Sequence, residues 1–547
     1  MTNKKQKLEL TWIGKDEELK LEPRILIEDP DKSYGDPKAE NMLIHGDNLL
    51  ALKALEQDFA GRIKCIYIDP PYNTGNAFEH YDDGIEHSIW LNLMKPRLEI
   101  LKSLLAKDGV IFISIDEEEQ AYLKIICDEV FERKNFCGTF IWEKKKKPSF
   151  LSNMGSITEF ILSYAKNKTL APAFIYGETT KNKKYPINNA GNGVRVLNFK
   201  AGAVSFNIPD GFIEPQDMSS GNIITKLLDK VEIKDSKNVK DFRLEGEWRY
   251  SQTKLDEIIE NNEKILISQI PFRPNHIKNG GEPKKMKNLL SIAHYDMATY
   301  EDSTAESINL FGDNPFDYPK PEKLLYTLIS SVTSENDFVL DSFLGSGTTA
   351  AVAHKMGRKY IGVELGNHAH THCVPRLKKV IDGNDGLALS EALGWKGGGG
   401  FKFYNLAPSL LRKDSFGNLV IDEKYNSNML AAAMCKHEGF KFYPDETLYW
   451  KHGKSTESDF IFVTTGFITA EQLDKIHSEM KAGESLLICA KSFAPECENH
   501  FANITIKKIP QMILGRCEFG KDNYDLNIIK ATEAEAEESN ETEAVTI

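Results

Sequence analysis

The stretch "DFVLDSFLGSGTTAAVAHKMGRKYIGVELG", residues 337–366, reads as a strand, a glycine loop, a helix and a second strand. An apolar run leads into Gly345 and Gly347, and a helical pattern follows them. Glycines at such a turn let the backbone approach a ligand closely, and the N-terminus of the next helix offers free N–H groups. The second strand ends at Glu364, where an acid can bind ribose hydroxyls. The stretch predicts a site for a nucleoside-containing cofactor, with a purely structural turn as the alternative.

The loop restricts the kind of cofactor but does not select one. The dinucleotide fingerprint G-x-G-x-x-G is incomplete because Ala350 stands at its last position, yet that position tolerates Ala, so NAD stays open. The Gly-Lys-Ser/Thr sequence of a phosphate-binding P-loop is absent. S-adenosylmethionine contains ribose and adenine but no phosphate, so a close turn and an acid would suffice for it.

Strand and helix patterns alternate upstream of this stretch as well. "NMLIHGDNLLALKAL" (41–55) reads as a strand followed by a helix, "CIYI" (65–68) as a short buried strand and "VIFISID" (110–116) as a further strand. Apolar residues at helical spacing cover about 90–105 and 118–131. Strands that alternate with helices predict an α/β domain with a largely parallel sheet.

The alternation is interrupted once. Between about 168 and 300 the chain is rich in Asn, Gly, Lys and Pro and has only short alternating runs, which indicates an inserted domain. A glycine-rich hinge, "GWKGGGGFKFYNL" (394–406), precedes another α/β segment. The predicted divisions are an N-terminal extension (1–35), the first half of the α/β domain (36–167), the insert (168–300), the second half (301–393), a C-terminal domain (394–530) and an acidic tail (531–547).

The composition indicates a globular cytoplasmic protein. Hydrophobic residues make up 41% and charged residues 27% of the 547 residues, and no apolar run approaches the ~18 residues of a membrane span. The N-terminus has no apolar core of a secretory signal, and eight cysteines scattered singly fit a reducing compartment. The net charge is −13, but the tail holds six Glu without Lys or Arg and is expected to be disordered. The overall charge therefore does not exclude a nucleic-acid partner, which depends on local basic surface.

The stretch "CIYIDPPY" (65–72) ends an apolar strand with an acid, two prolines and an aromatic residue. The prolines make the chain turn rigidly, and a simple strand-ending turn is one interpretation. The other is a rigid shelf on which Asp69 and the carbonyl of Pro70 accept hydrogen bonds from an exocyclic amine while Tyr72 stacks on the base. Such a shelf would align the amine nitrogen with the sulfonium methyl group of S-adenosylmethionine, on a base drawn out of the duplex.

These motifs together resemble the amino-group DNA methyltransferases. "DPPY" precedes "FLGSG", an order similar to the β class, whose fold is a circularly permuted Rossmann-like methyltransferase sheet. "FDYPKPEKLL" (316–325) and "HGDNLLAL" (45–52) look like two further family motifs. Longer stretches, among them "EPRILIEDPDKSYGD", "HCVPRLKKVIDG" and "GWKGGGGF", are similar to modification subunits of type III restriction–modification systems.

The resemblance implies an adenine-N6 DNA methyltransferase that uses S-adenosylmethionine and base flipping. It further implies a homodimer, a double-stranded DNA substrate, a partner restriction subunit with helicase and nuclease parts, and a target-recognition role for the insert. Three alternatives stay open: a solitary methyltransferase, a cytosine-N4 enzyme, and a non-enzymatic DNA-recognition scaffold. DPPY in place of SPPY favours adenine over cytosine.

Residue roles carry over from the matching motifs. The target base would be held by Asp69, Pro70, Pro71 and Tyr72. The cofactor would be held by Asp341, Phe343, Gly345 and Gly347, with Glu364 on the ribose, Asp47 near the adenine and Lys320 at the methionine end. "SID" (114–116) is interpreted as a strand end that lines the pocket.

Lysine-rich runs are the candidate DNA contacts. They comprise Lys144, Lys145, Lys146 and Lys147 before the insert, and Lys183, Lys184, Lys284 and Lys285 within it, with Tyr185 and Phe272 as nearby aromatic residues. A charge run is also commonly a solvated face. His368, His372 and Cys373 have a spacing that suggests a metal site, but no second ligand cluster follows, so we expect the start of a helix there and no metal.

Overall fold

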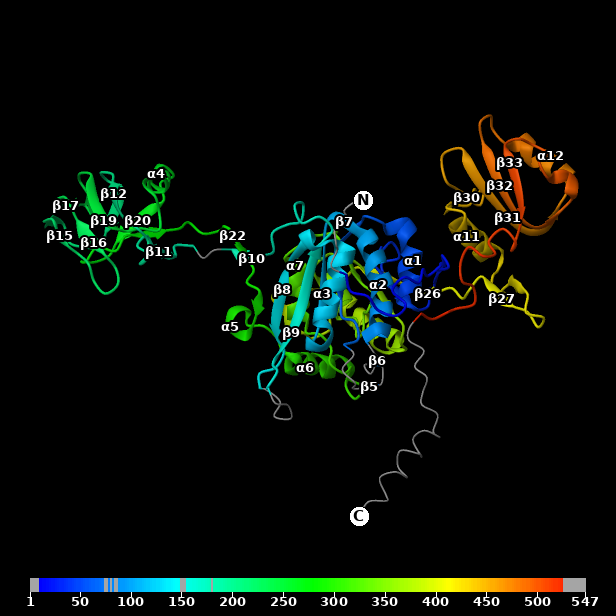
Figure 1. The fold of residues 1–547 in the computed structure, drawn as a ribbon, viewed down its shortest axis with the longest axis horizontal. Coiled ribbons are helices and arrows are strands. Elements are labelled where there is room, and N and C mark those ends of the chain that lie inside the picture. Colours follow the sequence, from blue (N-terminus) through cyan, green and yellow to red (C-terminus); the bar gives the residue numbers. More distant parts are fainter. Residues whose placement is uncertain are drawn as a thin grey trace, which may run out of the picture. The chain divides into compact units, whose positions relative to one another are not determined.

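An 11-stranded sheet organises the larger of two units in the computed structural model, Met1–Phe174 with Lys287–Ile547 (Figure 1). The smaller unit is Ile175–Met286. The structure describes residues 9–72, 77–78, 81–82, 87–147, 154–178 and 181–524, with the backbone alone at 77–78 and 81–82. The predicted acidic tail, 531–547, lies outside the described residues.

Six neighbouring strands of the large sheet run parallel, from β26 to β7, and β1, β9 and β8 add antiparallel pairings on either side. The strand order is β1 (Leu26–Glu28), β26 (Gly400–Leu406), β3 (Met42–His45), β25 (Lys359–Glu364), β24 (Phe338–Asp341), β4 (Ile63–Ile68), β7 (Leu105–Ile115), β9 (Thr158–Ala165), β8 (Phe136–Glu143) and β23 (Leu289–Leu290), with β2 (Tyr34–Gly35) beside β26. The predicted α/β domain with a largely parallel sheet is confirmed.

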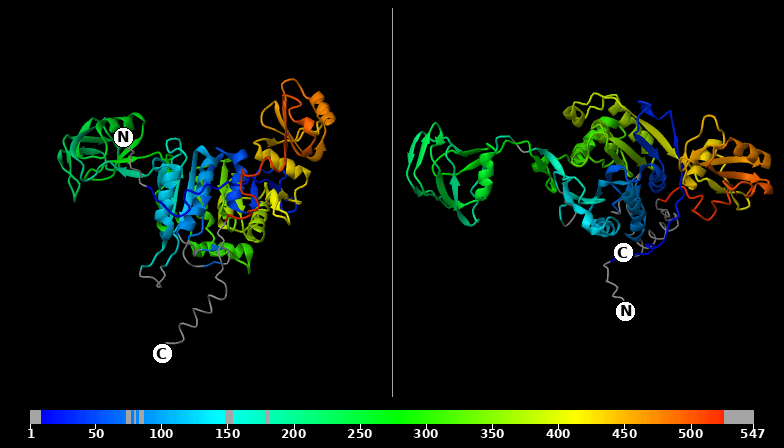
Figure 2. Two further views of the ribbon diagram at one scale, coloured as in Figure 1. Left: turned by 45° about the vertical axis from the view of Figure 1, so that its right-hand side comes forward. Right: turned by 90° about the horizontal axis from the view of Figure 1, so that it is seen from above.

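Helices pack on both faces of this sheet. One row consists of α1 (Asn48–Phe59), α2 (His87–Leu104) and α3 (Glu117–Phe131), and the other of α7 (Glu322–Ser330), α8 (Thr348–Lys355) and α9 (Val374–Ile381). Figure 2 shows the first row in blue and the second in green to yellow, with the sheet between them. Trp90, Met94 and Leu98 of α2 are fully buried against the sheet, as the helical spacing of these residues predicts. In the described part of the chain, no helix has the length and apolar character that a membrane span requires.

The two central βαβ units wind in opposite directions. The unit β4–α2–β7 continues to one side of the sheet, whereas β24–α8–β25 continues to the other. β4 and β24 themselves are parallel neighbours, with Leu340 aligned to Ile66. In such open sheets, ligands bind outside the carboxyl ends of the strands at the point where the direction reverses. The fold therefore predicts a site where Ile68 and Asp341 end their strands.

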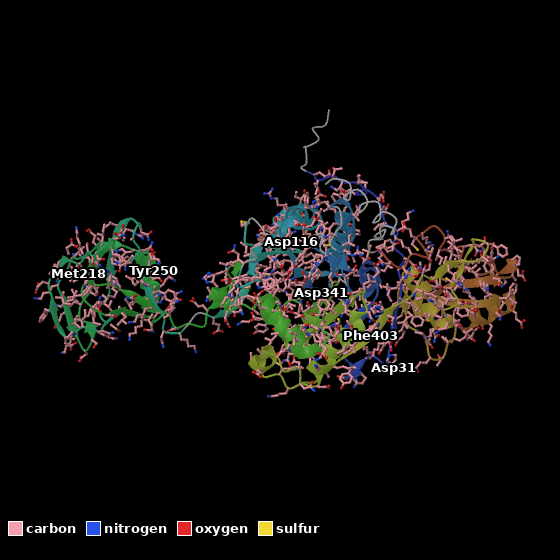
Figure 3. All side chains as sticks on the ribbon, turned by 90° about the horizontal axis from the view of Figure 1, so that it is seen from below. Asp31, Asp116, Met218, Tyr250, Asp341 and Phe403 are labelled. Atoms are coloured by element: carbon pink, nitrogen blue, oxygen red, sulfur yellow. The ribbon has the colours of Figure 1, made fainter. Side chains whose placement is uncertain are left out.

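The smaller unit, Ile175–Met286, is built mainly of short strands around its own core. One sheet has the order β11 (Lys184–Pro186), β21 (Asn275–Ile277), β20 (Lys264–Ile267), β13 (Val204–Phe206), β18 (Lys237–Asn238), β17 (Val231–Lys234) and β14 (Gly211–Ile213). A second has the order β12 (Val194–Phe199), β19 (Phe242–Glu247), β16 (Thr225–Leu227) and β15 (Gln216–Asp217), and β10 (Ile175–Glu178) pairs with β22 (Pro283–Lys285). Helix α4 (Gln252–Glu260) completes the unit, and the buried Met218, labelled in Figure 3, accepts a hydrogen bond from the backbone N–H of Phe272.

The structure corrects the predicted limits of the insert, 168–300. The separate unit is shorter at both ends, 175–286, because β23 pairs with β8 and so returns the chain to the large sheet. Two further helices, α5 (Ile292–Tyr295) and α6 (Tyr300–Phe311), follow β23 within the larger unit. A strand of two residues has no alternating pattern that a sequence could reveal.

The C-terminal boundary also differs from the prediction. Residues 400–406, predicted as part of a glycine-rich hinge, form β26 and pair with β3 in parallel, with Phe403 aligned to Leu43. The segment predicted as an N-terminal extension (1–35) contributes β1, which pairs with β26 in turn. The separate C-terminal sheet consists of β29 (Lys441–Phe442), β30 (Gly453–Lys454), β31 (Asp459–Ile468), β32 (Ser485–Phe493) and β33 (Ile504–Lys508), accompanied by α11 (Ser427–His437) and α12 (Ala470–Glu479).

A buried ionic network ties the second row of helices together. The Lys355 ammonium on α8 lies 2.6 Å from Glu322 of α7 and 2.5 Å from Asp385, and all three side chains are at most 1% exposed. Arg376 of α9 donates to the other Glu322 oxygen at 3.0 Å. A buried charge is tolerated only while its partners stay in place, so this network fixes the spacing of the three helices.

Replacing Lys355 by Met should lower the free energy of unfolding of the larger unit by about 3–5 kcal/mol, because Asp385 and Glu322 then lose a buried counter-charge. Urea unfolding followed by circular dichroism measures the change. Lys323→Met is the matched control, since its ion pair with Asp296 is solvent-exposed and should contribute less than about 1 kcal/mol. Equal losses in the two variants would contradict a structural role for the buried network.

Candidate active site

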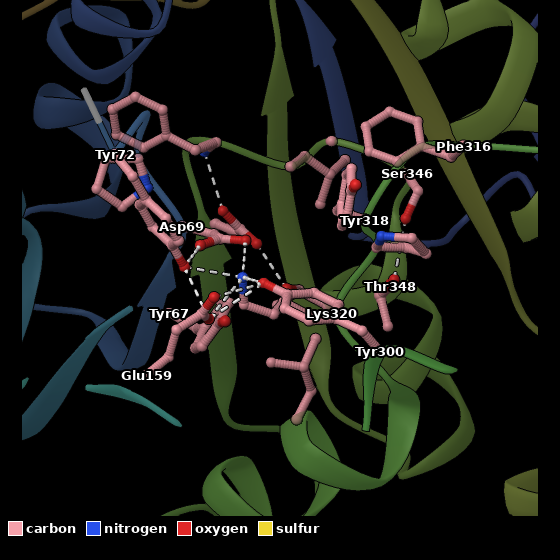
Figure 4. Close-up of a pocket in the computed structure, with 18 of the residues that line it drawn as sticks. Tyr67, Asp69, Tyr72, Glu159, Tyr300, Phe316, Tyr318, Lys320, Ser346 and Thr348 are labelled. Carbon is pink, nitrogen blue, oxygen red and sulfur yellow. Dashed lines mark hydrogen bonds and ion pairs between the residues drawn. The ribbon is translucent and has the colours of Figure 1, made fainter. Parts of the chain in front are cut away.

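A cavity of about 320 Å³ lies at the carboxyl ends of β4 and β24 (Figure 4). This volume is at the lower end of the range for small-molecule sites, roughly 300–1,000 Å³. Its walls come from segments far apart in the chain: 69–72 after β4, 316–320 before α7, and 341–349 from the end of β24 into α8. β9 and α6 supply Glu159 and Tyr300. The topology thus brings the two strongest sequence motifs to one cavity.

The segment after β4 is held rigidly. Trp90 of α2 donates its indole N–H to the carbonyl of Pro71 at 2.7 Å, and Pro70 is buried. The hydroxyl of Tyr72 donates to Asp69 Oδ1 at 2.6 Å, so the acid and the aromatic ring are linked to each other. The predicted shelf therefore has a specific anchor on the neighbouring helix, and its carboxylate faces the cavity.

Lys320 lies at the centre of the hydrogen-bond network in Figure 4. Its ammonium forms an ion pair with Asp69 Oδ2 at 2.8 Å and donates to the hydroxyls of Tyr72 at 2.8 Å and Tyr300 at 2.9 Å. The nearest oxygen of Glu159 is 3.6 Å away. The side chain of Lys320 is only 4% exposed. The resemblance assigns Lys320 to the methionine end of a cofactor, a role that stays a prediction, whereas its observed partners belong to the DPPY side of the cavity.

Glu159 is a site residue that the sequence analysis missed. Its carboxylate is 3% exposed and accepts hydrogen bonds from Tyr300 at 3.0 and 3.1 Å and from Lys144 at 3.0 Å. The hydroxyl of Tyr72, whose hydrogen points to Asp69, lies 3.3 Å from Glu159. Glu159 stands in the apolar strand "TEFILSYA". A charged residue inside a strand that is otherwise buried was the only signal available, since such residues are rare without partners.

The charges in the network stabilise one another. Burial opposes the charged form of Lys320, but Asp69 and Glu159 outweigh it and raise the pKa of Lys320 above its ordinary value. Burial would likewise raise the pKa of Glu159, yet Lys320 and Lys144 more than offset this and hold that pKa below its ordinary value. Burial, together with Asp69 and Glu159, keeps the pKa of Tyr72 well above 10, so its hydroxyl stays protonated.

The glycine loop forms the opposite wall. Gly345 and Gly347 have φ of 57° and 83°, in the left-handed region that favours glycine, and Gly347 precedes the first turn of α8. A Cβ at Gly347 would lie 3.3 Å from the Cα of Cys373, tighter than an ordinary contact. Arg376 steadies the next turn by donating to Thr348 Oγ1 at 2.8 Å. The loop therefore follows the predicted strand–loop–helix path.

Three acids were predicted to bind the cofactor. Asp341 and Glu364 accept hydrogen bonds from the glycine loop, and Asp47 caps a helix. Asp341 accepts from the N–H of Phe343 at 2.9 Å, and both residues line the cavity. Glu364 is 4% exposed, accepts from the N–H of Gly345 at 2.7 Å, and is not among the lining residues. Asp47 caps α1 by accepting from Leu50 N at 2.9 Å and does not line the cavity either. Contacts of Glu364 and Asp47 with a cofactor stay predictions.

Aromatic and acidic residues complete the rim. Tyr318 is 58% exposed and has φ of 48°, an uncommon conformation for an aromatic residue, and its ring meets Tyr300 edge-on. Asp116 at the end of "SID" lines the cavity, as predicted, and its burial raises its pKa to about 6. Figure 3 labels Asp116 and Asp341 within the larger unit. Backbone strain of the kind seen at Tyr318 is concentrated at functional sites.

The lysine run 144–147 divides between two environments. Lys144 and Lys145 line the cavity, and Lys144 is committed to Glu159. Lys146 forms an exposed ion pair with Asp302 at 3.1 Å, and Lys147 is exposed. Contact of any of these side chains with DNA stays a prediction, but the Lys144 ammonium already has a partner inside the protein.

The other lysine candidates lie in the smaller unit. Lys184, Lys284 and Lys285 stand in the short strands β11 and β22, and Lys183 precedes β11. All four are exposed, and the Lys183 ammonium lies 5.7 Å from the ring of Tyr185. The structure corrects the assignment of Phe272 to an aromatic contact surface, because Phe272 is fully buried in the core of this unit.

The histidines after β25 have contacts within the protein. His368 pairs with Glu364 at 2.6 Å, and His372 is 3.1 Å from the carbonyl of Asn314. The Cys373 thiol donates to the carbonyl of Gly345 at 3.1 Å. A π-helical turn, Ala369–Cys373, leads into α9 here. Among the residues that the structure describes, no group of three or more ligands could hold a metal ion.

Comparison with known proteins identifies the family of this chain. Residues 63–374, more than half of the chain, match the family model described as DNA methylase, so the chain belongs to the DNA methylase family. Among curated proteins it is similar to the probable type III restriction-modification enzyme HindVI Mod subunit of Haemophilus influenzae, with 37% identity over 424 residues. That match covers 69% of this chain and 55% of the relative.

Two further relatives carry similar names. The type III restriction-modification enzyme EcoPI Mod subunit of Escherichia phage P1 is 30% identical over 417 residues, 65% of this chain and 62% of that protein. The StyLTI Mod subunit of Salmonella typhimurium is 30% identical over 391 residues, 62% of this chain and 55% of that protein. The chain thus spans little more than half the length of these curated relatives.

Asp341 should make the stability of the larger unit depend on pH. Burial raises its pKa from 3.8 to about 7, which corresponds to a cost on the order of 4 kcal/mol for ionising it in the folded protein. The folded state holds the extra proton, so this contribution is complete below about pH 4 and is lost as the pH rises through about 7. Asn cannot ionise, and Asp341→Asn should therefore gain stability relative to the wild type between pH 4 and pH 8.

Thermal unfolding of both proteins across this pH range measures the effect. Asp31→Asn, at an exposed acid also labelled in Figure 3, is the control and should follow the wild type at every pH. A constant difference between Asp341→Asn and the wild type would contradict a buried, protonated Asp341.

Proposed function

We propose that this protein is a DNA methyltransferase that transfers a methyl group from S-adenosylmethionine to N6 of adenine. The observation that carries the proposal is the meeting of Asp69 and the glycine loop at one cavity, on the carboxyl ends of adjacent parallel strands. An acceptor for an amine and a loop suited to a nucleoside cofactor are the two parts that this reaction needs. Family membership supports the same reaction class.

The residues of the loop fit S-adenosylmethionine. The cofactor combines a cationic sulfonium, an ammonium, a carboxylate and a ribose diol. The lining residues between 341 and 349 offer the carboxyl group of Asp341, several hydroxyls and the N-terminal turn of α8. Asp341, Phe343, Gly345 and Gly347 would hold the cofactor, which when bound supplies an electrophilic methyl group.

The DPPY segment would orient the amine. The carboxylate of Asp69 and the carbonyl of Pro70 accept its two hydrogens, which directs the nitrogen lone pair toward the methyl group. Tyr72 and the exposed Tyr318 offer aromatic surface to the base plane. The target base has to leave the duplex to enter this cavity, at an unstacking cost of a few kcal/mol. Correct placement then supplies much of the rate enhancement.

The order of the motifs fits the permuted methyltransferase sheet. β4 with DPPY precedes β24 with the glycine loop, and the unit 175–286 is inserted between them. We assign target recognition to that insert because it is a separate unit with a net excess of basic residues over acidic ones. The names of the relatives support a modification subunit of a type III system, which would form a homodimer and bind a restriction subunit.

Asp69→Ala should abolish methyl transfer while binding to DNA that lacks the target adenine changes little, because the carboxylate orients the amine and does not contact the phosphates. Tritiated methyl transfer to DNA and fluorescence anisotropy measure the two properties. Single-molecule sequencing of DNA methylated by the wild type identifies the modified base and its sequence context. A wild type that methylates no DNA, or methylation of cytosine N4, would overturn the proposed reaction.

Gly345→Trp should block cofactor binding, since the indole would fill the wall on which Gly345 lies and Gly345 has a φ that other residues rarely adopt. Isothermal titration with S-adenosylhomocysteine measures the affinity, and binding to the variant should fall below detection. Gly61→Trp is the matched control, because Gly61 also has a positive φ but no atoms near its Cβ position. Unchanged affinity in Gly345→Trp would place the cofactor elsewhere.

A further inference from the structure

In the structure, both oxygens of Asp69 already have partners. Its Oδ1 receives the hydroxyl of Tyr72 at 2.6 Å, and its Oδ2 is paired with Lys320 at 2.8 Å. A carboxylate oxygen can accept two hydrogens, so a substrate amine can bond to Asp69, but it then shares the carboxylate with the Lys320 ammonium. The ammonium of Lys320 is the closest analogue of that amine, since it is also a nitrogen that donates hydrogen to the same carboxylate.

The charge of Lys320 also matters for the reaction itself. Methyl transfer moves positive charge from the donor onto the target nitrogen, and Asp69 stabilises this charge only while it is not neutralised by another cation. An ammonium that remained between Asp69 and the amine would repel the developing charge. Lys320 therefore has to leave Asp69 while it stays charged and buried, and this requires a second carboxylate close by.

Glu159 meets that requirement. It lies 3.6 Å from the Lys320 ammonium, within ion-pair distance but beyond a hydrogen bond, so the two can approach further. The hydroxyl of Tyr300 accepts from Lys320 and donates to Glu159, and the hydroxyl of Tyr72 accepts from Lys320 and lies 3.3 Å from Glu159. Both hydroxyls therefore connect the two ends of the movement. Lys144 is the second cation of the group and balances the second carboxylate.

We propose that Glu159 is a positioning residue that takes over Lys320 from Asp69 when the target amine enters. Two carboxylates and two ammonium groups are present in both arrangements, so the charge of the cavity does not change. Before substrate binds, Lys320 protects Asp69 as an internal substitute for the amine. After binding, Glu159 holds Lys320, and Asp69 faces the amine with its full negative charge. The inference rests on the proposed methyltransferase function.

Glu159→Gln removes the acceptor for Lys320 but keeps the size of the side chain. We expect Lys320 to remain on Asp69, kcat to fall at least ~10-fold, and the affinity for S-adenosylhomocysteine to stay within about twofold, the fall reflecting loss of one charged hydrogen-bond partner. Glu132→Gln is the matched control, because it makes the same chemical change at an exposed ion pair with Lys134, far from the lining residues. A kcat of Glu159→Gln within about twofold of the wild type would overturn the proposal.

A double-mutant cycle separates the transfer of Lys320 from general structural damage. In Glu159→Gln/Lys320→Met no ammonium remains on Asp69, so the loss in kcat caused by Glu159→Gln should be several-fold smaller in the Lys320→Met background than in the wild type. Equal losses in the two backgrounds would contradict the proposal. Glu159→Asp keeps the charge but moves it away from Lys320, and it should give an intermediate kcat. If Glu159→Gln does not fold, the kcat of Glu159→Asp is compared with that of the wild type in its place.

A binding measurement tests the same idea without turnover. With S-adenosylhomocysteine present, wild-type protein should bind a duplex carrying its mapped adenine ~10-fold more tightly than the same duplex with purine at that position, because only adenine has the amine that bonds to Asp69. Glu159→Gln should lose this preference, and a retained preference would argue against the transfer of Lys320. Failure of the wild type to methylate DNA would instead reject the proposed function, so the two failures are distinguishable.

Discussion

The parallel pairing of β4 with β24 is the constraint on which the rest of the structure depends. The two strands lie 270 residues apart in the chain, yet Leu340 stands beside Ile66 in the register. Their crossovers run in opposite directions, and the cavity lies at the carboxyl ends of the two strands, where this direction reverses. DPPY directly follows β4 and the glycine loop directly follows β24, and both motifs therefore line the cavity.

The site also depends on buried charge held in balance. Lys320, in the segment before α7, pairs with Asp69 and Glu159 at the cavity. Glu322, at the start of α7, pairs with Lys355 and Arg376 in the buried ionic network. Lys320 and Glu322 are two residues apart, so one short segment belongs to both networks. The proposed transfer of Lys320 would therefore take place beside an anchored segment, since breaking a buried ion pair is costly.

The inserted unit 175–286, to which we assign target recognition as a proposal, is structurally separate from this machinery. It has its own core, in which Phe199, Phe242 and Trp248 pack together, and its own sheets. A unit that supports itself can change its surface without disturbing the pairing of β4 and β24.

The sequence alone determined the α/β class, the positions of the main helices and strands, and the two motifs that line the cavity. These features are local: apolar periodicity, prolines after a strand and glycines before a helix act on near neighbours in the chain. The roles of Glu159 and Tyr300 in the site, and the pairing of Lys144 with Glu159, became visible only in the tertiary structure. These roles depend on contacts between residues that are more than a dozen positions apart in the chain, such as Tyr300 and Glu159, which are 141 positions apart. The partner of a buried charge is known only from the folded structure. The ion pairs of Asp69, Lys320, Glu159 and Lys144 could therefore not be predicted from the sequence.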